Sequence, residues 1–370
     1  MSARGLLVLI VLLLVLGGGA LIYQRQQATE RPQNAALLGK PVLKDLRAAD
    51  IAVIRIVKPK GKISAESTLT VQHKDDGWAI RERQDFPADV AKVREFVVKM
   101  IELKIGQSTP IDEKDRARLQ LDDPGKQGEG AGTLVEFDAL DGKPLAKLLV
   151  GKKYFKRDVE NPDKAPADGR FVALPEQPGT AYIVSDPLAQ ASTRSADWID
   201  RTSFEVEKVK TLEVRFADGS GWKIARSGDN ADWTLEGAKP GEKVDTGKAN
   251  SASYSLSLLE LADVAPKDAQ DTGLDKPTVI QASTLDGLSY TIRVGKPEGD
   301  NYYVAFSASG SLPADAGGKD DAERIKKLKA RLPIEKRLSD YVLLIPKSKL
   351  DDTLKPRSEL LEKKPETRKK

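Results

Sequence analysis

The chain has no cysteine and a single histidine, His73, among its 370 residues. Without cysteine it can form no disulfide, bind no metal through thiolates and carry no lipid on a cysteine side chain. One histidine cannot supply the paired or tripled imidazoles of zinc sites. A Ser-His-Asp triad would have to use His73, which lies in a predicted strand between Gln72 and Lys74, so a structural role is favoured over a catalytic one.

The acidic and glycine-rich segments also lack the spacings that bind calcium or phosphate. Paired aspartates occur at Asp122-Asp123, Asp320-Asp321 and Asp351-Asp352. None stands in the alternating Asp-x-Asp-x-Asp-Gly pattern of a calcium loop, and turns explain them. Four glycines lie within Gly125–Gly132, but no Gly-Lys-Ser/Thr sequence ends this segment as in a phosphate-binding loop. We therefore predict no catalytic, metal-binding or cofactor-binding residues, and a protein that is not an enzyme.

Charge is nearly balanced and well mixed along the chain. Lys and Arg number 60 against 56 Asp and Glu, which gives a net charge of +4. No basic stripe is interleaved with aromatic residues, which make up 5% of the chain, so we expect no nucleic-acid binding. Only the carboxyl-terminal tail has an excess of positive charge, from Lys363-Lys364 and Arg368-Lys369-Lys370. Such a run is typical of a solvated, disordered end rather than of a phospholipid contact.

One long apolar run stands at the amino terminus. Leu6 to Tyr23 carries no charge, and its length at about 1.5 Å per residue is about 27 Å, close to the hydrocarbon thickness of a bilayer. The sequence therefore predicts a membrane anchor over 1–23 and a linker over 24–39. A secretory signal cleaved near Gly18-Gly19-Ala20 is the alternative, but the run continues through Leu21-Ile22-Tyr23 and exceeds a usual signal core.

The flanks of this run bear on its orientation. Arg4 precedes it and Arg25 and Arg31 follow it, so the positive-inside count is nearly balanced. A very short amino-terminal flank ahead of a long globular body favours export of the body. We expect the amino terminus in the cytoplasm, a single pass through the inner membrane, and a body that lies in the periplasm or extracytoplasmic space.

Recurring motifs in a fixed order indicate that the body is duplicated. Val150-Gly151-Lys152 returns as Val294-Gly295-Lys296, and Asp141-Gly142 returns as Asp286-Gly287. The other pairs are Leu121-Asp122-Asp123-Pro124 with Leu274-Asp275-Lys276-Pro277, and Asp76-Gly77-Trp78 with Ala231-Asp232-Trp233. Such a repeat predicts two copies of one module, 40–205 and 206–362, followed by a basic tail over 363–370. The shared residues are of turn and core types, so the copies share a fold rather than a reaction.

Within each copy the apolar periodicity predicts strands, then one helix, then further strands. Short alternating runs punctuated by Gly and Asp are typical of antiparallel hairpins. The expected strands cover 51–57, 68–72, 78–80, 134–137, 145–150, 171–174 and 182–184 in the first copy, and 209–216, 222–225, 233–235, 279–283, 289–294, 302–306 and 341–345 in the second. Trp78 and Trp233 hold matched positions, which favours core packing over stacking on sugars.

A helix is expected after the third strand of each copy. In the first copy Val90, Val93, Val97 and Met100 step by three and four residues and mark its buried face. In the second copy an ungapped helix sets Tyr254, Leu258, Leu259 and Leu261 against Phe96, Met100, Ile101 and Leu103. A further short helix is expected at 322–331. The fold class is therefore α+β: an N-terminal transmembrane helix, then two tandem repeats, each a mostly antiparallel β-sheet with one packed helix.

This order of parts resembles a bacterial family catalogued as domain of unknown function 4340. The resemblance rests on the Trp after a Gly/Asp turn, the Leu-Asp-x-Pro element, the Val-Gly-Lys strand end, and an Arg after the last strand, Arg201 and again Arg357. It covers roughly residues 45–360. It implies one amino-terminal membrane segment, and an association with ATP-binding-cassette (ABC) transporters of the gliding-motility type, beside which many members are encoded. It implies no catalytic residues.

Two functional hypotheses follow. The first is a non-catalytic, membrane-tethered extracytoplasmic accessory or scaffold protein with a protein partner, in an ABC-type export or gliding-associated transporter complex. The alternative is an anchored module that binds envelope glycan or peptidoglycan. We expect partner contacts where the copies differ, in Gly125–Gly132, Lys156–Arg170 and Ala314–Arg337, because the duplicated core is occupied with folding. Excision of Ala314–Arg337 is expected to leave the body folded.

Overall fold

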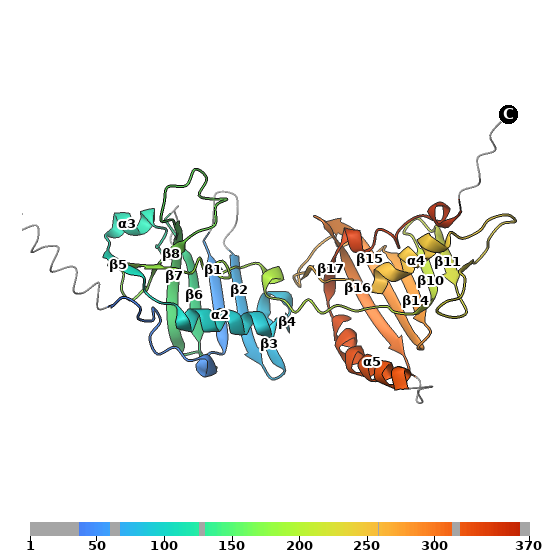
Figure 1. Cartoon of the computed structure of the whole chain (residues 1–370), viewed down its shortest axis with the longest axis horizontal. Helices are drawn as coiled ribbons and strands as arrows, with labels where there is room; N and C mark the ends of the chain where they lie inside the picture. The colour runs from blue at the N-terminus through green and yellow to red at the C-terminus, as the bar shows by residue number, and fades with distance from the viewer. Residues whose placement is uncertain (1–36, 60–66, 126–129, 258, 313–318, 363–370) are drawn as a thin grey trace, which may run out of the picture. The chain divides into compact units, whose positions relative to one another are not determined.

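The structure, a computed structural model, describes residues 37–59, 67–125, 130–257, 259–312 and 319–362 (Figure 1). These residues form two compact units. The first holds the chain up to Ala79 and Val90–Asp197, and the second holds Ile80–Asp89 and the chain from Trp198 onward. The anchor predicted over 1–23, most of the linker and the tail lie outside the described residues. Among the residues that are described, no helix has both the length and the apolar character needed to cross a bilayer.

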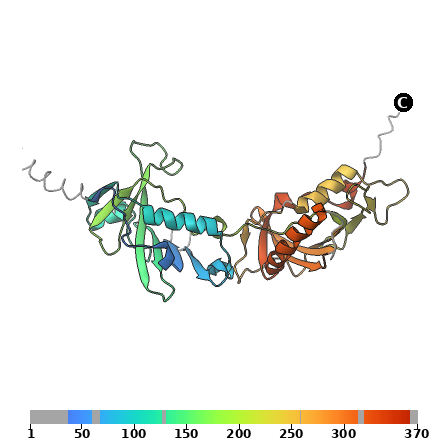
Figure 2. The same ribbon diagram turned by 60° about the horizontal axis from the view of Figure 1, so that its bottom comes forward.

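The first sheet has nine strands, and its described strand pairings are antiparallel. Across the sheet they are β4 (Phe86–Pro87), β3 (Gly77–Ile80), β2 (Ser67–Lys74), β1 (Val53–Lys58), β6 (Thr133–Asp138), β7 (Pro144–Tyr154), β8 (Gly169–Ala173), β9 (Thr180–Val184) and β5 (Gln107–Pro110). Helix α2 (Val90–Glu102) crosses the strands (Figure 2). It buries Val93, Phe96, Val97 and Met100, whereas Val90, expected on that face, is 48% exposed because it begins the first turn.

The second sheet repeats this topology with eight strands. Their order is β12 (Thr234–Leu235), β11 (Gly221–Ala225), β10 (Val209–Arg215), β14 (Thr278–Thr284), β15 (Leu288–Glu298), β16 (Asn301–Gly310), β17 (Val342–Pro346) and β13 (Asp263–Val264). If β4 is left out and the strands of each unit are counted in chain order, the two sheets have the same strand order when read from β3 and from β12. The duplication and the mostly antiparallel α+β class predicted from the sequence are therefore confirmed. Helices α4 (Thr246–Tyr254) and α5 (Lys319–Leu338) lie over this sheet (Figure 2).

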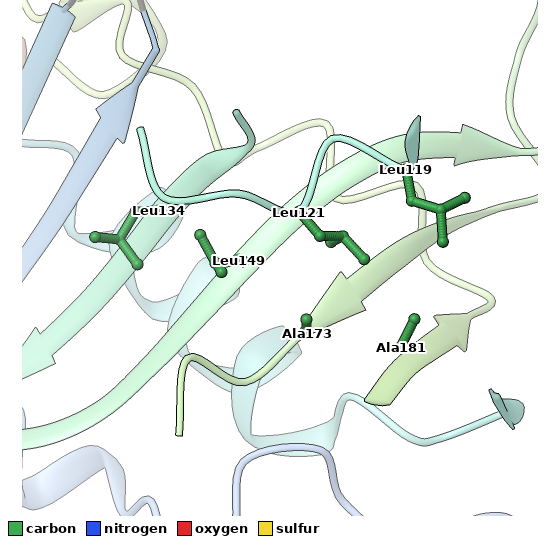
Figure 3. Close-up of a cluster of buried hydrophobic side chains, with 6 residues drawn as sticks. All are labelled: Leu119, Leu121, Leu134, Leu149, Ala173 and Ala181. Carbon is green, nitrogen blue, oxygen red and sulfur yellow. The ribbon is translucent and has the colours of Figure 1, made fainter. Parts of the chain in front are cut away.

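The Val-Gly-Lys and Leu-Asp-x-Pro motifs meet in space in the first unit. Lys152 N donates a hydrogen bond to Leu119 O at 2.8 Å, so the loop after α3 (Glu113–Arg118) crosses β7 beside Gly151. A Cβ on Gly151 would lie 2.4 Å from Leu119 O and 2.7 Å from Cδ2 of Leu121. Only glycine allows so close a backbone approach. The loop buries an apolar cluster over the strands, formed by Leu119, Leu121, Leu134, Leu149, Ala173 and Ala181 (Figure 3).

The second unit makes the same crossing. Lys296 N donates to Thr272 O at 2.8 Å, and a Cβ on Gly295 would lie 2.2 Å from that oxygen. It would also lie 3.3 Å from Cδ2 of Leu274, the leucine of the second Leu-Asp-x-Pro element. The Val-Gly-Lys and Leu-Asp-x-Pro motifs therefore recur together, because the glycine of the first leaves room for the loop that carries the second.

A segment of the first repeat completes the second unit. Residues Ile80–Asp89 start at the last residue of β3 and include β4, an edge strand of the first sheet, but they group with the second unit. Phe86 is 1% exposed, and its ring packs edge-to-face on Tyr341 with 4.9 Å between centroids. Arg83 pairs with Asp263 of β13 at 3.2 Å, and both side chains are largely buried. Part of the core of the second unit is thus supplied from residues far earlier in the chain.

The helix of the second repeat is shorter than predicted. Helix α4 ends at Tyr254 and gives way to a 3₁₀ turn instead of continuing to residue 261. Ser255 Oγ donates to Ala252 O at 3.1 Å, and Ser257 Oγ donates to Tyr254 O at 2.8 Å. Hydroxyls that bind these carbonyls compete with the helical backbone bonds. Consequently Tyr254, which the sequence sets against the buried Phe96, is 64% exposed.

The resemblance singled out Arg357, which fastens the end of the second unit. It lies in a 3₁₀ turn (Arg357–Leu360). Its guanidinium donates to both carboxylate oxygens of Glu242, at 2.7 and 3.3 Å, and to Gly237 O at 3.3 Å. These hydrogen bonds from Arg357 lower the pKa of Glu242 from its ordinary value near 4.5 to about 2.

The pair predicts an acid-dependent loss of stability. Because the pKa of Glu242 is lower in the folded chain than in the unfolded chain, its stabilising contribution is present above about pH 4.5 and is lost as pH falls towards 2. Denaturant midpoints measured across this pH window should fall more steeply for the wild type than for Glu242→Gln. Parallel slopes for the two proteins would contradict the assignment.

Candidate functional site

A polar groove lies in the second unit between α4, α5 and residues 206–208, which lead into β10. One hollow of about 490 Å³ is lined by hydroxyl and amide groups of α4 and by Lys208, Arg226 and Arg324. A second hollow of about 390 Å³ runs beside α5 and shares Glu207 and Arg324 with the first. We call the two together the α4–α5 groove.

The two units begin with the same backbone contact. In the first, Val42 N donates to Leu103 O, just after α2, at 2.8 Å. In the second, Val206 N donates to Leu256 O, just after α4, at 3.0 Å. The segment that begins each repeat is therefore hydrogen-bonded to the backbone just after that repeat's helix.

The connection from that contact to the first long strand differs between the units, and in the second unit it lines the groove. Between Val42 and β1 the first unit holds residues 43–52, which include the buried Leu43 and Leu46 and a 3₁₀ turn (Ala48–Asp50) packed against α2. Between Val206 and β10 the second unit holds only residues 207 and 208.

One wall of the groove is built around Arg226. Its Nε donates to Val209 O at 2.7 Å, and its Nη2 pairs with Asp229 at 3.0 Å. Its guanidinium lies over the Trp233 ring, 4.7 Å from the centroid. The Trp233 indole donates in turn to Asn250 Oδ1 of α4 at 2.8 Å. Arg226 therefore joins the sheet to α4 and keeps its charge paired.

The two matched tryptophans differ in burial. Trp233 is 6% exposed, as its predicted core role requires. Trp78 is only half-buried, and its ring packs edge-to-face against that of His73 with 5.4 Å between centroids. The core role is therefore wrong for Trp78, because its ring lies beside an exposed residue on β2 rather than under a guanidinium. His73 is a ring neighbour of Trp78 on the surface.

The opposite wall is α5. Arg324 Nε lies 3.2 and 3.1 Å from the two carboxylate oxygens of Asp286, which belongs to the Asp-Gly turn between β14 and β15. The turn motif of the repeat thus holds this helix in place. Predicted over 322–331, the helix runs from Lys319 to Leu338. Excising Ala314–Arg337 would remove the buried Leu328 and Glu335, so on this structure we expect the excision to destabilise the second unit.

A buried ionic network lies under the second hollow. Glu335 is 1% exposed; it accepts from Tyr290 Oη at 3.2 Å and pairs with Arg331 Nε at 2.9 Å. Arg331 also pairs with Glu205 at 2.6 Å and Glu207 at 3.3 Å. Burial raises the pKa of Glu335, an effect that Arg331 partly offsets, and burial also raises the pKa of Tyr290. These groups fix α5 to the segment that enters β10.

The groove leaves a few groups available to a ligand. Among the described residues, neither Lys208 nor Lys327 has an ion-pair partner. Tyr254 presents an exposed ring at the rim, beside the exposed Ser251. This arrangement can bind a polar, charged ligand.

The other predicted contact segments belong to the first unit. In Lys156–Arg170, the ammonium group of Lys153 on β7 binds the carbonyls of Pro162, Asp163 and Ala165, which closes the loop on itself. Of Gly125–Gly132, residues 126–129 lie outside the described structure. Throughout the described ranges, no three Asp, Glu or His side chains converge as a metal site requires.

Comparison with known proteins gives one match. The model of a family described as "Domain of unknown function (DUF4340)" matches residues 78–277, from Trp78 on β3 to the Pro of the second Leu-Asp-x-Pro element. No match is found among curated proteins or among solved structures. The matched residues make up more than half of the chain and span parts of both repeats. The chain belongs to the DUF4340 family.

Proposed function

We propose that this chain is a non-catalytic, membrane-tethered accessory protein that holds a partner protein outside the cytoplasmic membrane, within an ABC-type export or gliding-associated transporter complex. The observation that carries the proposal is the pairing of the three arginines in the α4–α5 groove. Arg226, Arg324 and Arg331 are each fixed by a carboxylate. Their guanidinium groups stay protonated and are held in place, so they shape the groove rather than transfer protons. The groove instead offers a shaped polar surface.

The tether and the setting rest on the sequence. The uncharged run from Leu6 to Tyr23 is long enough to span a bilayer. The resemblance that pointed to the family also implies a membrane segment and a transporter partner. Two duplicated sheets without shared reactive groups suit a scaffold better than an enzyme.

Binding of envelope glycan receives less support. Sugar rings stack on exposed aromatic faces, and the face of Trp233 is occupied by Arg226 at 4.7 Å. Tyr254 is the exposed aromatic residue that the described groove offers. A protein partner fits this surface better, because tyrosine, serine and asparagine are the residues that adaptable protein-binding surfaces use most.

The proposal predicts how the protein behaves in cells. The full chain should sediment with membranes and resist carbonate extraction, and deletion of residues 1–27 should release a folded, soluble body. An ABC-type ATPase and its permease should co-purify with the full chain after crosslinking.

Three outcomes would count against this proposal. A soluble protein that begins near Leu21 would show a cleaved signal instead of an anchor. Failure of the permease to co-purify would remove the transporter setting. Turnover of an envelope substrate that His73→Ala abolishes without loss of fold would overturn the non-catalytic assignment.

A further inference from the structure

We infer that the contact between α5 and residues 204–207 is a pH-sensitive switch that regulates the α4–α5 groove. The contact is closed while Glu335 carries a proton, and it opens when Glu335 loses that proton. Glu205, Glu207 and Arg331 belong to the contact and also line the second hollow, so its opening changes the shape of the groove. The exposure of this switch to the pH of the medium rests on the proposed function, which places the body outside the cytoplasm.

One cation serves three carboxylates at this contact. Arg331 pairs with Glu205 at 2.6 Å, with Glu335 at 2.9 Å and with Glu207 at 3.3 Å. Within the described parts of the chain, no other Lys or Arg pairs with these three side chains. The side chains of Glu205 and Glu207 are 49% and 44% exposed, so water can solvate their charges. Glu335 is 1% exposed, so the shortage of positive charge falls mainly on its carboxylate.

The hydrogen bonds to Glu335 compensate poorly for its burial. The carboxylate accepts from Glu205 N and from Tyr290 Oη of β15, both at 3.2 Å, the long end of the usual range. Arg331 Nε lies close to it, but among the described residues this buried N–H makes no hydrogen bond. Strand β16, which packs against α5, places the uncharged Phe306 beside Tyr290. Burial therefore raises the pKa of Glu335; the charge of Arg331 and the two hydrogen bonds offset this only in part.

Closure of the contact is favoured at low pH. A carboxyl group whose pKa lies above its ordinary value near 4.5 in the folded chain binds its proton more tightly when it is buried. The contribution of Glu335 to closure is therefore present below about pH 4.5 and is lost as pH rises through its raised pKa. For one proton, the ratio of open to closed molecules rises by up to about tenfold per pH unit across that window.

Helix α5 is weakest at this contact. Pro333 lies inside the helix between Arg331 and Glu335, and it has no N–H to complete the helical hydrogen bond to the carbonyl four residues earlier. Both ends of the helix are held by other contacts, because Arg324 pairs with the turn between β14 and β15, and Leu338 is buried. We expect the middle of α5 to move away from residues 204–207 while its ends stay on the sheet.

The test measures the distance across the groove in the purified full-length chain. The chain has no native cysteine, so Ser251→Cys on α4 and Ala330→Cys on α5, both at exposed positions, can carry two nitroxide labels. Pulsed EPR should give one distance at about pH 4.5, and a second, longer distance whose population grows by about threefold or more between about pH 5 and about pH 8. Glu335→Gln keeps the shape of the side chain but cannot ionise, so it should give the first distance alone at every pH.

Two further variants separate the switch from a general effect of charge. Glu323→Gln is the matched control, since it removes an exposed carboxylate of the same helix that has no part in the contact. It should respond to pH as the parent does. Glu205→Gln should respond less, because Arg331 then pairs more fully with Glu335 and lowers its pKa.

A distance that stays constant with pH in the parent would overturn the inference. So would a pH response that Glu335→Gln retains, or one that Glu323→Gln removes. If the permease still co-purifies with the chain in those cases, the proposed function stands without the switch. The expected pH response in a chain that recovers no permease would support the switch and reject the proposed function.

Discussion

Gly295→Ala is expected to destabilise the second unit by about 3 kcal/mol or more, at the upper end for over-packed sites. The added methyl group would lie 2.2 Å from Thr272 O, a backbone atom that cannot move without opening the loop from β15. The loop is also held by the hydrogen bond from Lys296 N. Denaturant unfolding followed by tryptophan fluorescence would measure the loss, since three of the four tryptophans, Trp198, Trp222 and Trp233, lie in this unit.

The matched control is Gly228→Ala, where a Cβ would meet no atom within 4 Å. It should change stability by less than about 0.5 kcal/mol. The repeat supplies a second test in the first unit, where Gly151→Ala should be severe and Gly179→Ala mild, because no atom lies within 4 Å of a Cβ on Gly179. If alanine at residues 295 and 228 had equal effects, the loop crossing would not be the reason for glycine.

Phe86→Ala is expected to destabilise the second unit by about 3–5 kcal/mol, the range for a buried phenylalanine. The residue lies in the first repeat of the sequence, but its ring is 1% exposed and packs on Tyr341. In a Trp78→Phe background, the remaining tryptophans all report on the second unit. Their unfolding transition should therefore move to lower denaturant.

Tyr254→Ala is the control, since it also removes an aromatic side chain from the second unit, but from a site 64% exposed. It should leave the transition within about 0.5 kcal/mol of the parent. A fragment that starts at Trp198 should be unstable for the same reason, because it lacks Ile80–Asp89. A transition unaffected by Phe86→Ala would mean that this segment does not support the second unit.

Much of the sheet architecture could be predicted from motif order alone. The Asp-Gly turns fix hairpins, and the alternation of apolar residues fixes which face of each strand is buried, so β6 with β7 and β14 with β15 were predictable. The closeness of Gly151 to Leu121 was indicated by the fact that the Val-Gly-Lys and Leu-Asp-x-Pro motifs both occur twice. Hairpins depend on residues that are close in the sequence, and the motif contact could be inferred because the same pair of motifs occurs in both repeats.

The short edge elements could not be predicted. Strands β4 and β13 are two residues long, and no periodicity can be read over that length. Their positions depend on tertiary contacts such as Arg83 with Asp263 and Phe86 with Tyr341. No local pattern in Ile80–Asp89 indicates that it belongs with residues more than half the chain away.

The groove was also hidden, although its signals lay in the sequence. The run of serines from Ser251 to Ser257 alternates with other residues and opposes continued helix, which would have marked the end of α4 and the exposure of Tyr254. The short connection through Lys208 becomes visible only when the two repeats are aligned at Val42 and Val206. Matching Tyr254 to Phe96 at a constant offset concealed both features.

The placement of Ile80–Asp89 sets an order of events during biosynthesis. Phe86 leaves the ribosome early, whereas β17 and its neighbour Tyr341 are among the last parts to be made. Closing so long a stretch of chain is entropically unfavourable, and contacts of this kind form slowly. Until then the phenylalanine ring lacks its contact with Tyr341. A chain cut short before β17 therefore exposes apolar surface from its first repeat, which chaperones and proteases can recognise.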